Sequence, residues 1–383
     1  MKITEKKRSI CIKEIAMAAI LLALFMGTVA QTSAAGAVSF SDVSEQTAYY
    51  NDICWAVEQG IVTGDNGNFK PEQNVTVQQF FTMLSRAIPE RQESQDAAFD
   101  APKGSMLYHL RRAIHQGWTD SLGTLVELSK DSALNAGCAW NAALMAAGTQ
   151  VYSGALLGEA ANPSADGMRA AKALNLAGKD ADASKRLTRA EAVHLIRAAV
   201  ENTKVLPEPD IVKEMKNAVQ NVRQNDVSSV YADLMRIPEP IRKAFRQDGW
   251  IIRFDPDAVQ AYSEKSGISN INGMTEYQDK TIYLANVKSL LHELGHYYQE
   301  KLKSSGMDKN VYALFDAIRL QETASATIYE AGDQRDGKEF FADAFRFYVL
   351  YSRTQAELSS KESPGSSESQ RYFDHLKETG WVK

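Results

Sequence analysis

The sequence has few cysteines and no excess of positive charge, and both features exclude classes of protein. Only three of its 383 residues are cysteines, and their spacing matches no metal-binding or redox motif. Cys54 and Cys138 could pair in an oxidising exterior, or both could be buried thiols. Acidic residues outnumber basic ones, 48 against 43, which leaves a formal net charge of −5 and no basic field to attract DNA or RNA. We therefore expect no nucleic-acid partner.

Long apolar runs are also absent, apart from one near the N-terminus. There a basic segment with Lys6, Lys7 and Arg8 precedes a 16-residue apolar run from Ile15 to Ala30, and small residues follow. This order predicts a secretory signal peptide over residues 1–37, because a run shorter than about 18 residues favours cleavage over a membrane anchor. No later segment is long enough to span a bilayer. We expect a secreted protein with no transmembrane span after signal cleavage.

The rest of the chain contains enough apolar residues, 44% overall, for a sizeable core in two or three domains. A weak repeat runs through residues 38–202, with units at about 38–90, 98–150 and 151–202. The first unit reads as a helix, a Gly-rich turn and a second helix. This period predicts a mostly helical array of three units that share one core.

Parts of these units, "FSDV", "GIVTG", "FKPEQNVT" and "LTRAEAVHLIRAA", resemble surface-layer homology (SLH) repeats. That family forms a three-fold helical bundle that holds exported proteins on bacterial cell-wall polysaccharide, so the resemblance implies attachment to the cell wall or surface layer. Its wall-contacting motif, Thr-Arg-Ala-Glu, is present only at 188–191, and it implies Arg189 and Glu191 as polysaccharide contacts. The corresponding residues are expected at 76–79 in the first copy and at 130–133 in the second. Thr188 and Glu191 also fit a capping box, which is a purely structural role.

Residues 203–210, "TKVLPEPD", read as a Pro-containing linker, and the pattern becomes mixed after it. We expect an α+β domain over 211–383. The strand "KTIYLA" (280–285) fits either a sheet edge that pairs with an extended peptide or a core strand. The predicted elements are a helix over "DIVKEMKNAVQNVRQ" (210–224), a strand over "WIIRF" (250–254), and two strands within 273–285 around a turn at Gln278-Asp279.

The most informative segment is "SLLHELGHYYQEKL", residues 289–302. Residues four apart on a helix share a face, so His292 and His296 can bind one ion, and Glu293 between them can act as a general base. With six histidines in the chain, this pattern arises by chance less than about one time in a hundred. A catalytic zinc site needs a third protein ligand, for which Glu339 in "GKEFFADAFRFYVLYSR" is the candidate. Asp343, one turn further on, can accept the free ring N–H of a ligating histidine.

Together, "LLHELGHYYQEKL" and "EFFADAFRFY" resemble the zinc metallopeptidase domain of the anthrax lethal factor-like family, which includes secreted Pro-Pro endopeptidases. The resemblance covers roughly residues 205–383. It implies a zincin-type fold, one zinc ion per chain held by His292, His296 and Glu339, and Glu293 as the catalytic base. The family usually has an oxyanion-donating tyrosine seven residues before the ligand glutamate, where this chain has Gly332. Tyr329, three residues earlier, is either that donor or a packed core residue.

The function expected from these features is that of a secreted, cell-wall-associated zinc metalloendopeptidase. Its substrates would be extracellular proteins or peptides, and the family resemblance gives Pro-Pro sites as one option. The alternative is an inactive wall-bound structural or adhesive protein with a degenerate peptidase domain. Structural zinc sites usually have four protein ligands, whereas the sequence offers three, and this favours the catalytic interpretation. His375, the remaining histidine of this domain, is expected to be exposed.

Overall fold

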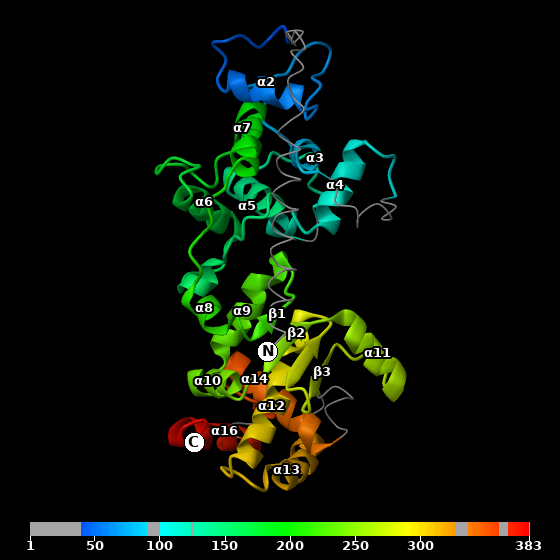
Figure 1. Ribbon diagram of the computed structural model, residues 1–383, viewed down its shortest axis with the longest axis vertical. Helices are drawn as coiled ribbons and strands as arrows, with labels where there is room; N and C mark the ends of the chain where they lie inside the picture. The colour runs from blue at the N-terminus through cyan, green and yellow to red at the C-terminus, as the bar shows by residue number, and fades with distance from the viewer. Residues whose placement is uncertain (1–39, 90–99, 124–125, 326–335, 360–366, 383) are drawn as a thin grey trace, which may run out of the picture.

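The computed structural model describes residues 40–89, 100–123, 126–325, 336–359 and 367–382. The predicted signal peptide lies outside these residues. Two modules are stacked along the long axis of the molecule, the N-terminal one entirely helical in its described residues and the C-terminal one α+β (Figure 1). Each module has its own hydrophobic core. None of the helices in the described ranges is both long and apolar enough to span a membrane.

The described residues of the N-terminal module form six α-helices, two from each of the three predicted units. Three residues in equivalent positions, Val75, Leu134 and Leu187, are buried at its centre. Val75 N donates to Leu187 O at 2.9 Å, Leu187 N to Leu134 O at 3.1 Å, and Leu134 N to Val75 O at 3.1 Å. This closed ring of hydrogen bonds gives the module an approximate three-fold axis. Helices from neighbouring units pack on each other, namely α3 on α4, α5 on α6 and α2 on α7. In order, the units contain α2 (Tyr50–Glu58) and α3 (Val77–Ala87), α4 (Met106–His115) and α5 (Ala136–Ala146), and α6 (Pro163–Ala173) and α7 (Arg189–Val200).

The ring also corrects the expected alignment of the second repeat. Thr76, Asn135 and Thr188 each follow a ring residue and cap the next helix, with the side chain accepting from the backbone N–H three residues on. The counterpart of the Thr-Arg-Ala-Glu motif in the second unit is therefore 135–138, not 130–133 as the sequence suggested. Residues 130–133 lie before the cap, where Lys130 and Ser132 carbonyls accept from the first unit.

The C-terminal module contains a four-stranded sheet in the order β1-β2-β4-β3. Strands β1, β2 and β4 are parallel to one another, and β3 is antiparallel to β4. Because β3 is last in this order, it forms one edge of the sheet. The strand that the sequence offered as a possible edge, β4, is an interior strand with Ile282 and Leu284 fully buried. The strands are β1 (Val219–Gln220), β2 (Ile251–Phe254), β3 (Gly273–Glu276) and β4 (Thr281–Leu284).

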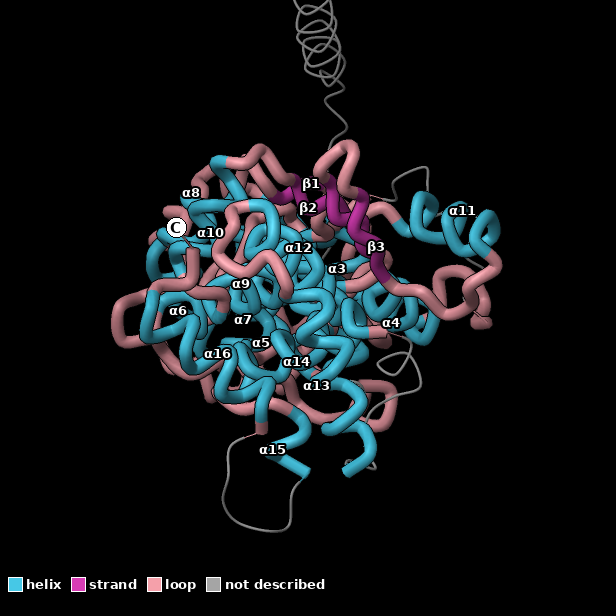
Figure 2. Tube along the Cα trace, turned by 90° about the horizontal axis from the view of Figure 1, so that it is seen from below, coloured by secondary structure: helices cyan, strands magenta, loops and turns pink. Residues whose placement is uncertain are grey.

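Helices pack mainly on one side of this sheet, and α11 projects away from the main body (Figure 2). The helix expected over 210–224 is wrong beyond Met215, because Val219 pairs with Ile252 in the sheet and Asn221 takes a left-handed backbone conformation. The strands expected at 250–254 and around Gln278-Asp279 are present. The helices are α8 (Asp210–Met215), α9 (Val227–Arg236), α10 (Glu239–Gln247), α11 (Pro256–Ser266), α12 (Leu290–Ser304), α13 (Val311–Ser325), α14 (Gly337–Tyr351), α15 (Gln355–Ser359) and α16 (Glu368–Thr379).

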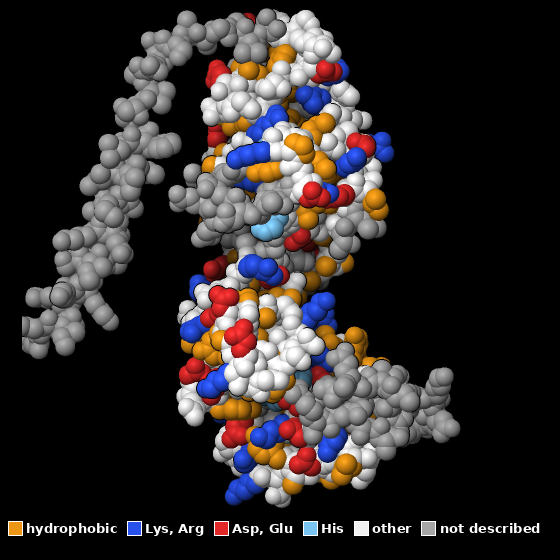
Figure 3. Space-filling view, turned by 90° about the vertical axis from the view of Figure 1, so that its right-hand side faces the viewer, with side chains coloured by type: hydrophobic (Ala, Val, Ile, Leu, Met, Phe, Trp, Pro, Cys, Tyr) orange, Lys and Arg blue, Asp and Glu red, His pale blue; other side chains and the backbone are white. Residues whose placement is uncertain are grey.

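The two modules contact each other directly where the molecule narrows between them (Figure 3). Leu156, in the short 3-10 helix η3 (Gly154–Leu157) of the N-terminal module, is buried in the core of the C-terminal module. A Cβ atom on Gly117 would lie 1.6 Å from Nδ2 of Asn225, so the Asn225 side chain lies directly against the backbone of the N-terminal module there. The connection between the modules is thus more than the linker at 203–210.

Candidate metal centre

Helix α12 anchors the candidate centre because one of its faces is buried. Leu290, Leu294, Tyr298 and Leu302 recur at intervals of four residues and are all buried in the core. The two histidines of the helix lie one turn apart beside this face and line a cleft of about 1000 Å³. A rigid helix therefore presents both imidazoles to the same space.

Helix α14 brings the third candidate ligand to the same cleft. Asp336 caps its N-terminus, accepting from Lys338 N at 2.8 Å and from Glu339 N at 3.1 Å. The helix packs on α12 at a point of close backbone approach, where a Cβ atom on Gly295 would lie 2.7 Å from Cα of Ala342. This contact places Glu339 opposite the two histidines.

The donor atoms of His292, His296 and Glu339 converge. Nε2 of His292 lies 3.2 Å from Nε2 of His296 and 3.3 Å from Oε2 of Glu339, and Nε2 of His296 lies 3.7 Å from Oε1 of Glu339. Zinc bond lengths of about 2.0–2.1 Å in a tetrahedral site separate two ligand atoms by about 3.3 Å. The donor set, two imidazoles and one carboxylate, is also one that zinc favours. These three side chains therefore fit a zinc ion with an open fourth position.

Glu293 lies beside this cluster and is 5% exposed. Thr275 Oγ1 on β3 donates to its Oε2 at 2.7 Å. Burial raises the pKa of Glu293 to about 7, although the charge on His292 and the hydrogen bond from Thr275 act in the opposite direction. A carboxylate with such a pKa can both accept and return a proton near neutral pH.

Asp343 is buried, 2% exposed, and joins two side chains that line the cleft. It accepts from Nδ1 of His292 at 2.8 Å and from Nη2 of Arg346 at 2.9 Å. The first contact fixes the His292 tautomer, leaving Nε2 to face the cluster. Arg346 was not identified from the sequence, although its i, i+3 spacing from Asp343 is a detectable signal.

The two histidines have opposite pKa shifts. Burial disfavours the charged form of His292, but its hydrogen bonds to Asp343 and Glu339 outweigh this effect and raise its pKa to about 10. Burial and the adjacent charge of His292 lower the pKa of His296 to about 4. His292 therefore carries an additional ring proton at neutral pH, and a cation bound to its Nε2 would displace that proton.

The structure leaves two of the remaining sequence-predicted residues of this module undescribed and places the third away from the cluster. Tyr329 and Gly332 lie in residues 326–335, outside the described residues. His375 is on α16, and its side chain does not line the cleft in the described part of the chain. Tyr277 does line it, with its hydroxyl 3.4 Å from the carbonyl oxygen of His296.

A separate groove of about 370 Å³ lies in the N-terminal module between the first and third units. Arg189 extends into it, with its Nε donating to Phe69 O at 2.8 Å and its guanidinium 5.0 Å from the centre of the Phe69 ring. Lys70 and Arg86 line the same groove. Glu191 instead caps α7 in a capping box with Thr188 and pairs with Lys185. The Glu191 side chain therefore stabilises the N-terminus of α7.

The other two units lack an arginine at the position of Arg189. The ring alignment places Val77 and Ala136 there, both buried. Cys138 occupies the position of Glu191, and both Cys138 and Cys54 are free thiols. Among the three equivalent positions, only that of Arg189 places a positively charged side chain in a groove.

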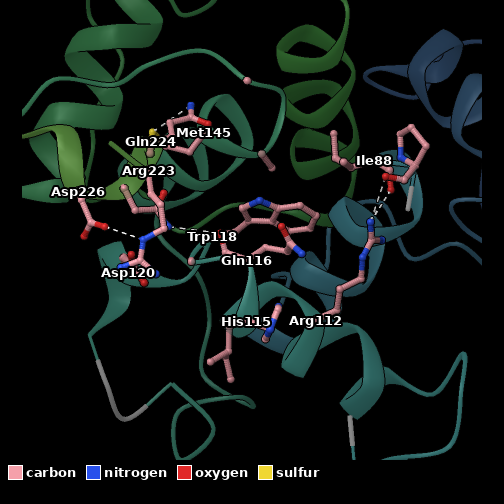
Figure 4. A pocket seen from close by; sticks show the side chains of 16 residues that line it. Ile88, Arg112, His115, Gln116, Trp118, Asp120, Met145, Arg223, Gln224 and Asp226 are labelled. Atoms are coloured by element: carbon pink, nitrogen blue, oxygen red, sulfur yellow. Dashed lines mark hydrogen bonds and ion pairs between the residues drawn. The ribbon is translucent and has the colours of Figure 1, made fainter. Parts of the chain in front are cut away.

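A third cavity, of about 570 Å³, lies at the junction of the modules (Figure 4). Trp118 lies between Arg112 on one side and Arg223 on the other. Arg112 donates to the carbonyls of Ile88 and Pro89 at the end of α3, and Arg223 pairs with Asp226 at 2.7 Å. Arg112 thus links α4 to the end of α3, whereas the pair of Arg223 with Asp226 is local.

Comparison with known proteins supports one part of this picture. Residues 39–81 match the model of the S-layer homology domain. This match indicates a protein associated with the cell surface or cell wall, since such domains typically bind cell-wall polysaccharide. No curated protein and no solved structure matches the chain.

Proposed function

We propose that this protein is a zinc-dependent metalloendopeptidase held at the cell wall by its N-terminal module. The observation that carries the proposal is the convergence of two imidazole nitrogens and one carboxylate, 3.2 to 3.7 Å apart, beside a buried glutamate. Zinc that hydrolyses peptides is typically held by three protein ligands of these types with one open position.

Each residue of the centre has a separate role in the proposed reaction. His292, His296 and Glu339 would hold the ion, and Asp343 would fix the orientation of His292. Bound zinc would lower the pKa of water to about 7 and polarise a peptide carbonyl. Glu293 would accept a proton from the attacking water and return it to the leaving amine. Its pKa of about 7 suits both steps.

The position of β3 supports a peptide as the substrate. This strand is at the sheet edge, and its residues Gly273 and Thr275 line the cleft directly beside Glu293. An extended chain can add to a free strand edge through backbone hydrogen bonds, which places its peptide bonds along the cleft. Extracellular proteins are the accessible substrates for a wall-bound enzyme, and Pro-Pro peptides are the first to test because of the family resemblance.

The test uses the whole protein, with zinc content and cleavage measured on the same preparations. Wild type is compared with Glu293→Ala, which removes the base but no ligand, and with Glu276→Ala, which removes an exposed carboxylate in the same cleft. We expect about one zinc per chain in all three and cleavage of a peptide library in all but Glu293→Ala. Zinc without cleavage in the wild type would favour the inactive adhesive alternative, and absence of zinc would refute the proposal.

The wall-binding part of the proposal rests on the groove that contains Arg189. A guanidinium there, with Lys70 and Arg86 nearby, suits an acidic polysaccharide. Because the equivalent positions hold Val77 and Ala136, we expect one principal binding groove in this module. Binding of the purified protein to isolated cell walls, measured by co-sedimentation, tests this part independently of zinc.

A further inference from the structure

The carboxylate of Glu293 is held by a neighbouring strand as well as by its own helix. Thr275 Oγ1 on β3 lies 2.7 Å from Oε2 of Glu293 and 3.2 Å from the carbonyl oxygen of the same residue. The hydroxyl thus contacts both the side chain and the backbone of Glu293. A rotation of the glutamate side chain away from β3 would break the shorter of these contacts.

Gly273 provides the space that this arrangement requires. It lies two residues before Thr275, on the same face of β3. A Cβ atom at this position would lie 2.8 Å from both Cγ and Oε1 of Glu293, closer than real Cβ contacts. Gly273 has no left-handed backbone conformation that would demand glycine. Glycine is therefore required here for the proximity of the glutamate.

The register of the sheet fixes both residues in place. Gly273 pairs with Leu284 and Thr275 pairs with Ile282, and both partners on β4 are fully buried. A slip of β3 by one residue would turn Gly273 and the Thr275 hydroxyl to the opposite face of the sheet, away from Glu293. The contact with Glu293 is thus set by the core of the module.

We propose that Thr275 is a positioning residue for Glu293, with Gly273 as the space that admits the carboxylate. A glutamate side chain has three rotatable bonds, and a hydrogen bond to Oε2 selects one arrangement and leaves Oε1 to accept a proton. This inference rests on the proposed function of Glu293 as the general base. Thr275 does not touch the reacting atoms, and its effect is exerted through Glu293.

The test compares Thr275→Val, which removes the hydroxyl at nearly constant shape, with Thr275→Ser, which keeps it. Thr281→Val is the matched control, because the Thr281 hydroxyl on the adjacent strand donates to the local carbonyl of Asp279 at 3.2 Å and makes no hydrogen bond to Glu293 in the described structure. Crystal structures of the four whole proteins give the conformation of Glu293 directly. We expect a displaced or multiple conformation in Thr275→Val alone. An unchanged Glu293 in that variant would overturn the proposal.

Kinetics provide the second readout on the same proteins. We expect kcat on a cleaved library peptide to fall about 10- to 100-fold in Thr275→Val, the scale of a small misplacement of a catalytic group, with KM and zinc content unchanged. Thr275→Ser should restore activity to within about threefold of wild type. A rise in KM with kcat unchanged, or an equal fall of kcat in Thr281→Val, would refute the role of Thr275 in positioning Glu293. If the wild type cleaves nothing, the proposed function fails, whereas the crystal structures still decide the role of Thr275.

Discussion

Gly295 of α12 lies directly against the backbone of Ala342 on α14, between the two helices that carry the candidate zinc ligands. A Cβ atom on Gly295 would lie 2.7 Å from Cα and 2.9 Å from the carbonyl oxygen of Ala342. Gly295 immediately precedes His296, and Ala342 lies between Glu339 and Asp343. The spacing of the donor atoms therefore depends on a glycine that contributes no donor.

Gly295→Ala should separate the two helices and weaken metal binding. Overpacking of a close contact costs about 1–3 kcal/mol of stability, and the displacement of Glu339 adds to the loss of zinc affinity. Zinc content after dialysis and the thermal unfolding midpoint measure these effects. Gly178→Ala is the control, because a Cβ atom there would meet nothing within 4 Å. Equal zinc binding in both variants would show that the contact does not set the site.

Asp343→Asn should lower zinc affinity about 10- to 100-fold, the usual effect of losing the carboxylate behind a ligating histidine. The amide cannot stabilise His292 as the carboxylate does, and it leaves Arg346 without its charged partner. Competition with a chromogenic chelator measures the affinity. Asp374→Asn is the control, since Asp374 accepts from Tyr348 at 2.8 Å outside the cleft. A similar loss in both variants would indicate general destabilisation.

Glu293→Gln should stabilise the metal-free protein, and more so at higher pH. The pKa of Glu293 is raised to about 7 in the folded state from 4.5, so the folded state binds more protons than the unfolded state between these values. Stability of the wild type therefore falls as pH rises through this window, by up to about 3 kcal/mol at 1.36 kcal/mol per pKa unit. Glutamine does not titrate. Unfolding with a chelator present should show a larger advantage for Glu293→Gln at pH 8 than at pH 5.5, and a constant advantage would contradict the raised pKa.

Arg189→Ala should reduce co-sedimentation with cell walls at least about tenfold, the scale of a lost hydrogen bond to a charged group. Arg197→Ala on the same helix is the control, because Arg197 pairs with Asp52 and Glu201 and does not line the groove. Circular dichroism checks that both variants fold. Unchanged wall binding in Arg189→Ala would place the binding surface elsewhere on the module.

Leu156→Ala should destabilise the C-terminal module by about 2–5 kcal/mol, although the residue belongs to the N-terminal module. Its side chain is 6% exposed and lies in the C-terminal core. The adjacent Leu157 is 48% exposed, and Leu157→Ala should cost less than about 0.5 kcal/mol. Denaturant unfolding followed through the C-terminal tryptophans compares the two. Equal effects would mean that the modules are energetically independent.

The sequence was sufficient where the signal is local. The four-residue spacing of His292 and His296 predicts a shared helix face, and the alternation around Gln278-Asp279 predicts two strands, both of which the structure contains. It was insufficient where the signal depends on pairing. The helix expected over 210–224 ends early because Val219 joins a strand 33 residues away, and no local pattern reports such a partner.

By itself, the sequence determined which residue types are available for chemistry: two histidines one turn apart, a glutamate between them, and an acidic pair on a later helix. Only the tertiary structure decided which residues surround them: Arg346 contacts Asp343, and Thr275 and Gly273 lie beside Glu293. It also decided that β3, and not β4, forms the sheet edge. The physical reason is the sequence separation over which each interaction acts. Helix periodicity acts over a few residues of chain, whereas strand order and close packing arise when distant segments bury apolar surface together.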